Sequence, residues 1–212
     1  MGKNRILLID MYGVIIKESK GNFIPYTLQH FVADQHDRIW RAIKEEKLFT
    51  QAQLGFFTNE EFLRQMGYAD PKQTMEDYLK NYLNLDEQFI DFARKYSQVM
   101  DFCLLSNDVL EWSDFLTEYH HLNVFFKEKI ISGAIQMRKP DAKMFSYTLE
   151  RLRCKPEDCV FVDNSVMNLQ VADQMGISTI LFNRDGENYG GMVVNDYAEL
   201  AKMLDCVLLV NK

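Results

Sequence analysis

The chain has 212 residues, a mass of 24.9 kDa and a formal net charge of -7. Hydrophobic residues make up 47% of it and aromatic residues 13%, so it can bury a sizeable core, which excludes a disordered chain. The acidic balance argues against nucleic acid or an anionic membrane as the main partner, because neither attracts a negatively charged surface.

The first predicted element is a buried strand over residues 6–9, which ends at Asp10. The region 17–99 that follows contains helix signals and no strand run. Thr58 and Glu61 form a capping box, and Asp70 before Pro71 is a typical helix start. We therefore expect a small all-helical cap over residues 17–99. It would cover the carboxyl ends of the strands, where open α/β sheets bind their ligands.

Strand and helix signals alternate beyond residue 100. The predicted strands cover residues 102–105, 159–162 and 177–182, and the predicted helices cover 108–120, 141–152, 166–175 and 196–204. The strand runs show no polar alternation, which is typical of parallel strands buried on both faces. The sequence therefore predicts an α/β fold with a doubly wound, Rossmann-like parallel sheet. Residues 1–16 and 100–212 would form this core.

Polar residues follow the predicted strands at points where a ligand site would form. Asp10 ends the first strand, and Gly13 permits a tight turn beside it. Ser106 and Asn107 end the second strand and enter a helix, whose N-terminus favours anions. Each signal alone is also typical of a plain helix cap.

Two further signals lie later in the chain. Lys139 precedes Pro140 at a predicted helix start, where an ammonium group could neutralise a phosphate and a carboxylate. Asp163 ends the third buried run. With Asp10 it would supply two hard oxygen ligands, the usual number for a Mg²⁺ ion that keeps waters and shares phosphate oxygens.

Taken in order, these four motifs resemble those of the haloacid dehalogenase-like superfamily. The family pattern is Asp-x-Asp-Gly-Thr/Val, then Ser/Thr, then Lys-Pro, then an acidic pair with a trailing Asn and Gly. The matching residues extend from Asp10 to Gly176 and include a helical insert after the first motif. The ordered set is far more specific than any single motif, and it implies a hydrolase.

The resemblance also implies a role for each matching residue. Asp10 would attack phosphorus and form an aspartyl-phosphate, which water then cleaves. The implied Mg²⁺ ligands are Asp10, the main-chain carbonyl of Tyr12, and Asp163. The implied phosphate-binding residues are Ser106, Asn107 and Lys139, with Gly13, Asn164 and Asn168 as supporting residues. Lys139 would also neutralise Asp10 during catalysis.

Tyr12 departs from the pattern of the phosphatases, which carry a second Asp there to protonate the leaving oxygen. A phenol with a reference pKa near 10 replaces it poorly, and losing a general acid typically costs about 10²–10⁴ in rate. Tyrosine at this position resembles the Asp-x-Tyr-Gly-Thr motif of the 2-haloacid dehalogenases, whose halide leaves unprotonated. Asp163 favours the other chemistry, because those dehalogenases work without metal and lack this carboxylate.

Three functions stay open on this sequence. The favoured one is a Mg²⁺-dependent phosphohydrolase for a small phosphorylated metabolite, slow or restricted to good leaving groups such as acyl or aryl phosphates. The second is a dehalogenase or another carbon-centred hydrolase, in which Arg38 or Arg41 would hold the substrate carboxylate. The third is a binding or regulatory protein that keeps the fold with little turnover.

The cysteines and the N-terminal segment predict the cellular setting. The four cysteines form no CxxC pair, and two lie in apolar runs, which is typical of reduced thiols in the cytoplasm. The apolar run over residues 6–9 is too short for a signal peptide or a membrane span. We therefore expect a cytoplasmic protein that binds neither membrane nor nucleic acid.

Overall fold

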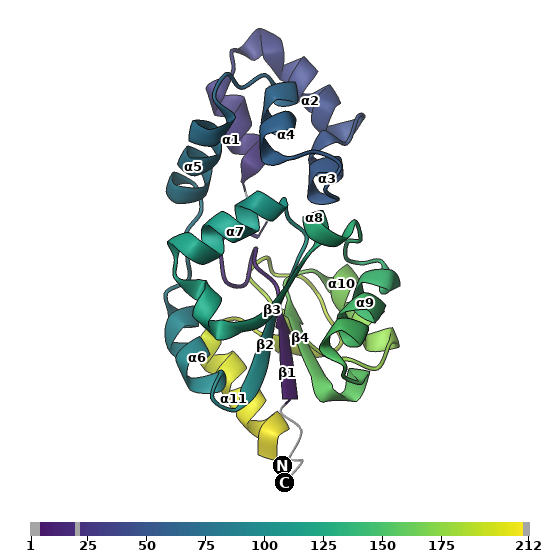
Figure 1. Ribbon diagram of the computed structural model, residues 1–212. Helices are drawn as coiled ribbons and strands as arrows, with labels where there is room; N and C mark the ends of the chain where they lie inside the picture. Colours follow the sequence, from purple (N-terminus) through teal and green to yellow (C-terminus); the bar gives the residue numbers. More distant parts are fainter. Residues whose placement is uncertain (1–4, 20–21, 210–212) are drawn as a thin grey trace.

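The computed structural model describes residues 5–19 and 22–209, so the expected domain limits at residues 1 and 212 lie outside the described residues. A six-stranded parallel sheet forms its centre, in the order β3-β2-β1-β4-β5-β6 (Figure 1). The strands are β1 (Arg5–Ile9), β2 (Met100–Ser106), β3 (Phe126–Ile131), β4 (Cys159–Asp163), β5 (Ser178–Phe182) and β6 (Met192–Val194). This confirms the predicted parallel α/β sheet.

Helices cover both faces of this sheet. The α-helices are α1 (Phe23–His30), α2 (His36–Lys44), α3 (Leu48–Gln53), α4 (Asn59–Met66), α5 (Pro71–Asn81), α6 (Gln88–Tyr96), α7 (Leu110–Tyr119), α8 (Ser132–Ile135), α9 (Ala142–Leu152), α10 (Val166–Gln174) and α11 (Tyr197–Leu209). Short 3₁₀ turns are η1 (Ala33–Gln35), η2 (Leu122–Phe125) and η3 (Pro156–Asp158). Apolar side chains of α6, α7 and α11 pack in one core cluster, and those of α9 and α10 in the other.

The central strands show why the apolar runs lack alternation. Leu7 and Ile9 of β1 belong to one core cluster, whereas Ile6 and Leu8 belong to the other. Because both faces of a central parallel strand are covered, every side chain between its ends is apolar.

Five helices, α1 to α5, form an insert between β1 and β2. The insert lies beyond the carboxyl ends of the strands in Figure 1. The capping box of Thr58 and Glu61 begins α4, and the Asp70 carboxylate accepts the Gln73 N–H at the start of α5. Both predicted helix starts are therefore confirmed.

The sixth helix packs with the sheet instead of the insert. The Phe92 ring of α6 lies 5.1 Å from the Tyr197 ring of α11, and both belong to the cluster on one sheet face. We therefore propose that the cap ends near Asp86 and that α6 belongs to the core, whereas the expected cap extended to residue 99.

Trp112 of α7 docks the insert onto the core. Its ring lies 5.1–5.2 Å from the rings of Phe23 and Tyr78, and its Nε1 donates a 2.6 Å hydrogen bond to the Asn59 side chain. Because Trp112 is only 1% exposed, this contact is a true core interface between the two parts.

Two strands and one helix differ from the prediction. The strands β3 and β6 were not predicted, because both lie at the edges of the sheet. β3 carries the charged run Lys-Glu-Lys, and such charges on an edge strand discourage pairing with another chain. The apolar residues Phe31, Ile39, Trp40 and Ile43 have the spacing of a single helix. Phe31 nevertheless lies outside the helices, because its extended backbone angles end α1, whereas the other three lie within α2. Among the described residues, no helix is long and apolar enough to cross a membrane.

Candidate active site

The carboxyl ends of three neighbouring strands, β2, β1 and β4, bring the predicted site residues together. Asp10 follows β1, Ser106 ends β2 and Asp163 ends β4. A cavity of about 190 Å³ opens at this edge. It is lined by Asp10, Tyr12, Ser19, Phe49, Gln53, Tyr78, Asn107, Lys139, Asn164, Ser165 and Asn168.

Lys139 forms the charged centre of this edge. Its Nζ lies 2.9 Å from Asp10 Oδ1 and 2.7 Å from Asp163 Oδ2. The lysine side chain is 1% exposed, and the two carboxylates are 10% and 0% exposed. Charges this deeply buried persist only when they are paired and hydrogen-bonded.

Backbone and amide groups fix the members of this triad. Asp163 accepts the Ser165 N–H at 2.7 Å and the Asn168 amide at 3.0–3.1 Å. The Asn107 side chain clamps the Lys139 backbone through two bonds of 2.8 Å, one to its N–H and one to its C=O. This clamp fixes the Lys139 backbone, and Asn107 also lines the cavity, so its expected contact with phosphate stays a prediction.

The triad has more negative than positive charge. Burial raises the pKa of Asp10 above its usual value, and although Lys139 opposes this, the Asp163 carboxylate adds to it. Burial alone would lower the pKa of Lys139, but the two carboxylates together raise it. Because two carboxylates share one ammonium, a further cation would be held favourably here.

The donor set is compatible with Mg²⁺. Asp10, Asp163 and the Tyr12 carbonyl offer hard oxygen ligands, and the described residues hold no cluster of three or more His, Cys, Asp or Glu side chains for a metal. Mg²⁺ is commonly bound by one or two carboxylates plus waters and substrate phosphate, and it needs no such cluster. Asp10 Oδ1 accepts the Met11 N–H and the Lys139 ammonium, and among the described residues Oδ2 has no donor.

Ser106 ends β2 and Gly13 lies in the turn after β1, and neither is among the residues that line the cavity. The Ser106 side chain is fully buried, and its Oγ has no hydrogen-bond partner among the described residues. A buried hydroxyl left unpaired costs about 1–3 kcal/mol, which a ligand oxygen would offset. Gly13 has φ +77°, and a Cβ there would lie 2.3 Å from the Asn164 amide nitrogen, so only glycine fits.

Tyr12 hydrogen-bonds the buried carboxylate of Asp108, which the sequence predicts only as part of a helix. Its hydroxyl lies 3.1 Å from both oxygens of Asp108, which is 0% exposed. Asp108 also accepts the Ser113 hydroxyl at 2.6 Å and the Val109 N–H at 2.9 Å. Burial raises the pKa of Asp108 to about 7, and burial together with Asp108 raises that of Tyr12 well above 10.

The insert supplies the opposite wall of the cavity. Phe49 and Gln53 of α3 and Tyr78 of α5 line it, and Gln53 donates a 3.1 Å hydrogen bond to the Asn107 carbonyl. Among the described residues no arginine lines the cavity. Arg38 instead donates to the Met66 carbonyl, and Arg41 is an exposed partner of Glu45.

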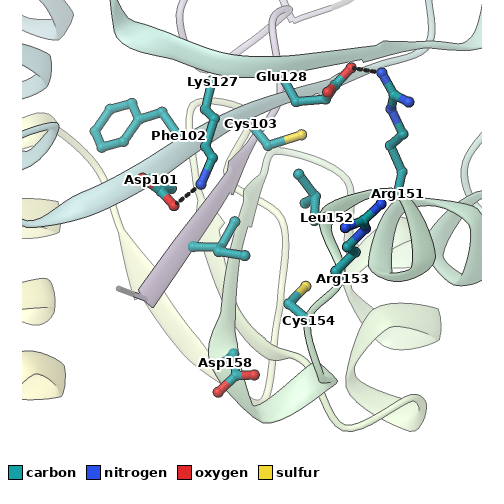
Figure 2. A pocket seen from close by; sticks show the side chains of 11 residues that line it. Asp101, Phe102, Cys103, Lys127, Glu128, Arg151, Leu152, Arg153, Cys154 and Asp158 are labelled. Atoms are coloured by element: carbon teal, nitrogen blue, oxygen red, sulfur yellow. Dashed lines mark hydrogen bonds and ion pairs between the residues drawn. The ribbon is translucent and has the colours of Figure 1, made fainter. Parts of the chain in front are cut away.

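A second cavity of about 440 Å³ lies at the opposite end of the sheet (Figure 2). Its charged side chains include the pairs Lys127–Asp101 and Arg151–Glu128, at 2.6 and 3.4 Å, which neutralise each other. Burial raises the pKa of the Cys154 thiol on its wall, which makes that sulfur a weak nucleophile. The larger cavity therefore lacks a reactive constellation.

Comparison with known proteins identifies relatives of this chain. A glyceraldehyde 3-phosphate phosphatase from Methanothermobacter thermautotrophicus is 32% identical over 96 residues, which are 40% of this chain and 41% of that protein. The chain spans 11–41% of the length of the curated relatives it matches.

Two solved structures share the fold. One is a HAD family enzyme from Bacteroides thetaiotaomicron in complex with magnesium and inorganic phosphate, with a TM-score of 0.72 and 22% identity over 88% of this chain and 97% of that one. The other is a HAD phosphatase from Thermococcus onnurineus, with a TM-score of 0.69 and 18% identity over 94% and 97%. Residues 5–176, most of the chain, match the family model of the haloacid dehalogenase-like hydrolases. The chain therefore belongs to the haloacid dehalogenase-like hydrolase family.

Proposed function

We propose that this protein is a Mg²⁺-dependent phosphohydrolase that acts through an aspartyl-phosphate on Asp10. The observation that carries the proposal is the buried contact of Lys139 with both Asp10 and Asp163. A metal-independent dehalogenase has no need of the second carboxylate. The phosphatase relative, and the structural neighbour bound to magnesium and phosphate, support the same reading.

Asp10 is the nucleophile in this proposal. A carboxylate oxygen attacks phosphorus, the bond to the leaving oxygen breaks, and water then hydrolyses the acyl phosphate to regenerate Asp10. Lys139 neutralises Asp10 and, with the unpartnered Ser106 hydroxyl, binds the phosphoryl oxygens. Asp10, the Tyr12 carbonyl and Asp163 would hold Mg²⁺, which when bound neutralises charge and orients the phosphoryl group.

The Tyr12–Asp108 pair limits the substrate to good leaving groups. A phenol has a single proton, and Tyr12 Oη directs it at Asp108 instead of the substrate. No acid of the usual kind therefore stands beside the leaving oxygen. Acyl and aryl phosphates need little protonation as they leave, so they suffer least.

The cavity favours a small substrate with a single phosphoryl group. Its volume of about 190 Å³ lies below the 300–1,000 Å³ typical of ligand pockets. Lys139 is the one cationic side chain among its described lining residues, and it already serves two carboxylates. We propose that the insert acts as a cap, with Phe49, Gln53 and Tyr78 against the uncharged leaving group.

The free thiols support the expected setting. The described chain holds four free cysteines, two of them buried. This fits a reducing compartment, and we propose that the protein acts in the cytoplasm on a small molecule.

Tyr12 also keeps a second function open, carbon-centred hydrolysis of the 2-haloacid dehalogenase type. The cavity argues against it, because no described arginine lines it to hold a substrate carboxylate. The same missing acid leaves room for a third, a binding or regulatory protein with little turnover.

The Asp10→Asn variant tests the proposed nucleophile. We expect acetyl phosphate and 4-nitrophenyl phosphate hydrolysis with Mg²⁺ to fall by about 10³-fold or more, because an amide oxygen attacks phosphorus poorly. Phosphate release is the measurement. Asp91→Asn, an exposed carboxylate 86% accessible on α6, is the matched control. Hydrolysis that survives in Asp10→Asn would refute the role, and Mg²⁺ binding without any hydrolysis would favour the low-turnover alternative.

Substitutions at Tyr12 test the leaving-group argument. We expect Tyr12→Asp to raise kcat/KM for glycerol 3-phosphate by about 10²-fold, because it restores a general acid, and to change acetyl phosphate far less. Tyr12→Phe should leave the ratio of the two substrates unchanged. If Tyr12→Phe selectively lost glycerol 3-phosphate, the phenol itself would be the acid and the argument would fail.

Thermal unfolding against pH, with and without Mg²⁺, tests the charge balance. A carboxyl whose pKa rises on folding keeps a proton that the unfolded chain has lost, so stability falls as pH rises. In EDTA we therefore expect Tm to fall between about pH 4 and pH 7, through Asp108 (from 3.8 to about 7) and Asp10 in the same direction. Mg²⁺ should raise Tm more at pH 8 than at pH 5. This response should vanish in Asp163→Asn and persist in Asp91→Asn, and an equal Mg²⁺ response in both variants would exclude the metal site.

Halide release distinguishes the second function. We expect no Asp10-dependent chloride from 2-chloropropionate in EDTA, because the cavity offers its carboxylate no free cation. Chloride release that persists in EDTA and stops in Asp10→Asn would replace the phosphatase assignment.

A further inference from the structure

Two linkers join the insert to the sheet and run side by side. Ile16 of the outgoing linker pairs with Leu85 of the returning one as an antiparallel bridge. The Lys17 N–H donates to the Asn84 carbonyl, and the Asp86 N–H to the Ile15 carbonyl, both at 2.9 Å. Any motion of the insert relative to the sheet therefore has to bend or shift these two linkers.

Arg184 reaches this pair from the loop that follows β5. Its Nε donates to the Gly13 carbonyl at 3.0 Å, and its Nη2 to the Val14 carbonyl at 3.2 Å. The same Nη2 forms an ion pair with the Asp86 carboxylate of the returning linker. The Arg184 side chain is 21% exposed and that of Asp86 is 10% exposed, so solvent screens the pair little.

The two carbonyls belong to the turn that begins at the candidate nucleophile. The Gly13 N–H bonds the Ile16 carbonyl at 2.7 Å, and the Ile16 N–H bonds the Met11 carbonyl at 2.8 Å, which closes the turn on itself. Tyr12, whose carbonyl is a candidate Mg²⁺ ligand, lies inside it. A shift of the Gly13 and Val14 carbonyls therefore moves the peptide that carries this ligand.

Asp86 is tied both to the linker pair and to the start of α6. Its backbone closes the linker pair, and its Oδ1 accepts the Gln88 N–H at 3.2 Å where α6 begins. One planar guanidinium thus connects the nucleophile turn, the returning linker and the loop after β5. A lysine ammonium lacks the fixed fork that such a triple contact needs.

We infer that Arg184 is a positioning residue that couples the linkers of the insert to the nucleophile turn. The guanidinium holds the Gly13 and Val14 carbonyls and the Asp86 carboxylate at once, so the shape of the turn depends in part on the position of the returning linker. The Tyr197 hydroxyl also donates to the Val14 carbonyl at 3.0 Å, but it forms no hydrogen bond with the Asp86 carboxylate. This inference rests on the proposed function only in its kinetic test, because hydrogen exchange can be measured whatever reaction the protein catalyses.

Hydrogen exchange and kinetics of four variants test this coupling. The variants are Arg184→Ala, Arg184→Lys, Asp86→Asn and the double variant Arg184→Ala/Asp86→Asn, with Arg94→Ala as control. Arg94 is an exposed arginine on α6 whose partner is Asp91. Amide exchange is followed in segments 13–19 and 84–88, and kcat and KM are measured with acetyl phosphate and Mg²⁺.

We expect Arg184→Ala to speed exchange in both segments and to lower kcat by about 10- to 100-fold, with a smaller change in KM, because the turn loses its shape. Arg184→Lys should keep segment 84–88 protected through its charge and lose protection in segment 13–19. Asp86→Asn should lower kcat, and the double variant should be no worse than Arg184→Ala. Free guanidinium should partly restore kcat and protection in Arg184→Ala.

Two results would overturn the inference. One is exchange and kcat in Arg184→Ala that match Arg94→Ala. The other is a lowered kcat with both segments still protected, or with additive effects in the double variant. If Arg184→Ala does not fold, Arg184→Lys and Asp86→Asn decide by the same criteria. If the wild-type protein releases no phosphate, the proposed function fails while the exchange results still decide the coupling.

Discussion

The burial of one lysine between two carboxylates is the constraint on which the rest of this structure depends. Lys139 contacts Asp10 and Asp163 where almost no water reaches them, so each charge relies on the other two. Parallel strands make this possible, because the carboxyl ends of β1 and β4 are neighbours in the sheet. The Asn107 clamp and the Asn168 amide then fix positions that the charges alone would leave loose. The surplus negative charge would favour the binding of a cation at this site.

Tyr12 occupies the position at which the phosphatases of this family carry an acidic residue. Where a carboxylic acid would face the leaving group, the phenol points its proton at Asp108, one layer deeper. Asp108 is fully satisfied there by the Ser113 hydroxyl and the Val109 N–H as well. Asp108 is fully buried and is not among the residues that line the cavity. Under the proposed function, such a site would keep nucleophilic attack by Asp10 and lack an acid for the leaving group, which would restrict the substrates.

Sequence reasoning succeeded where a residue's local context determines its place. The buried runs of β1, β2, β4 and β5 and the polar residues that end them follow from apolar patterning and strand topology. β3 and β6 were missed because edge strands carry charge and mimic loops. Asp108 was missed because a carboxylate at a predicted helix start has a sufficient local explanation as a cap. Arg184 carries no local signal at all, since its partners Gly13 and Val14 lie about 170 positions away and only the folded chain brings them together.

The insert and the sheet are joined in two ways in this structure. They share an aromatic core around Trp112, and the Arg184–Asp86 ion pair connects the returning linker to the loop after β5. Trp112 of the core is buried among aromatic rings of the insert, so separating the two parts would expose a large apolar surface. The ring contacts and the hydrogen bond of Trp112 hold the insert against the sheet, but none of them is made with the turn after Asp10. The linkers supply the missing connection, since the turn after Asp10 continues directly into the outgoing linker and hydrogen-bonds the returning one. Phe49, Gln53 and Tyr78 of the insert form part of the walls of this small cavity. The residues proposed to select the substrate and the turn proposed to carry the nucleophile therefore depend on the same contacts between insert and sheet.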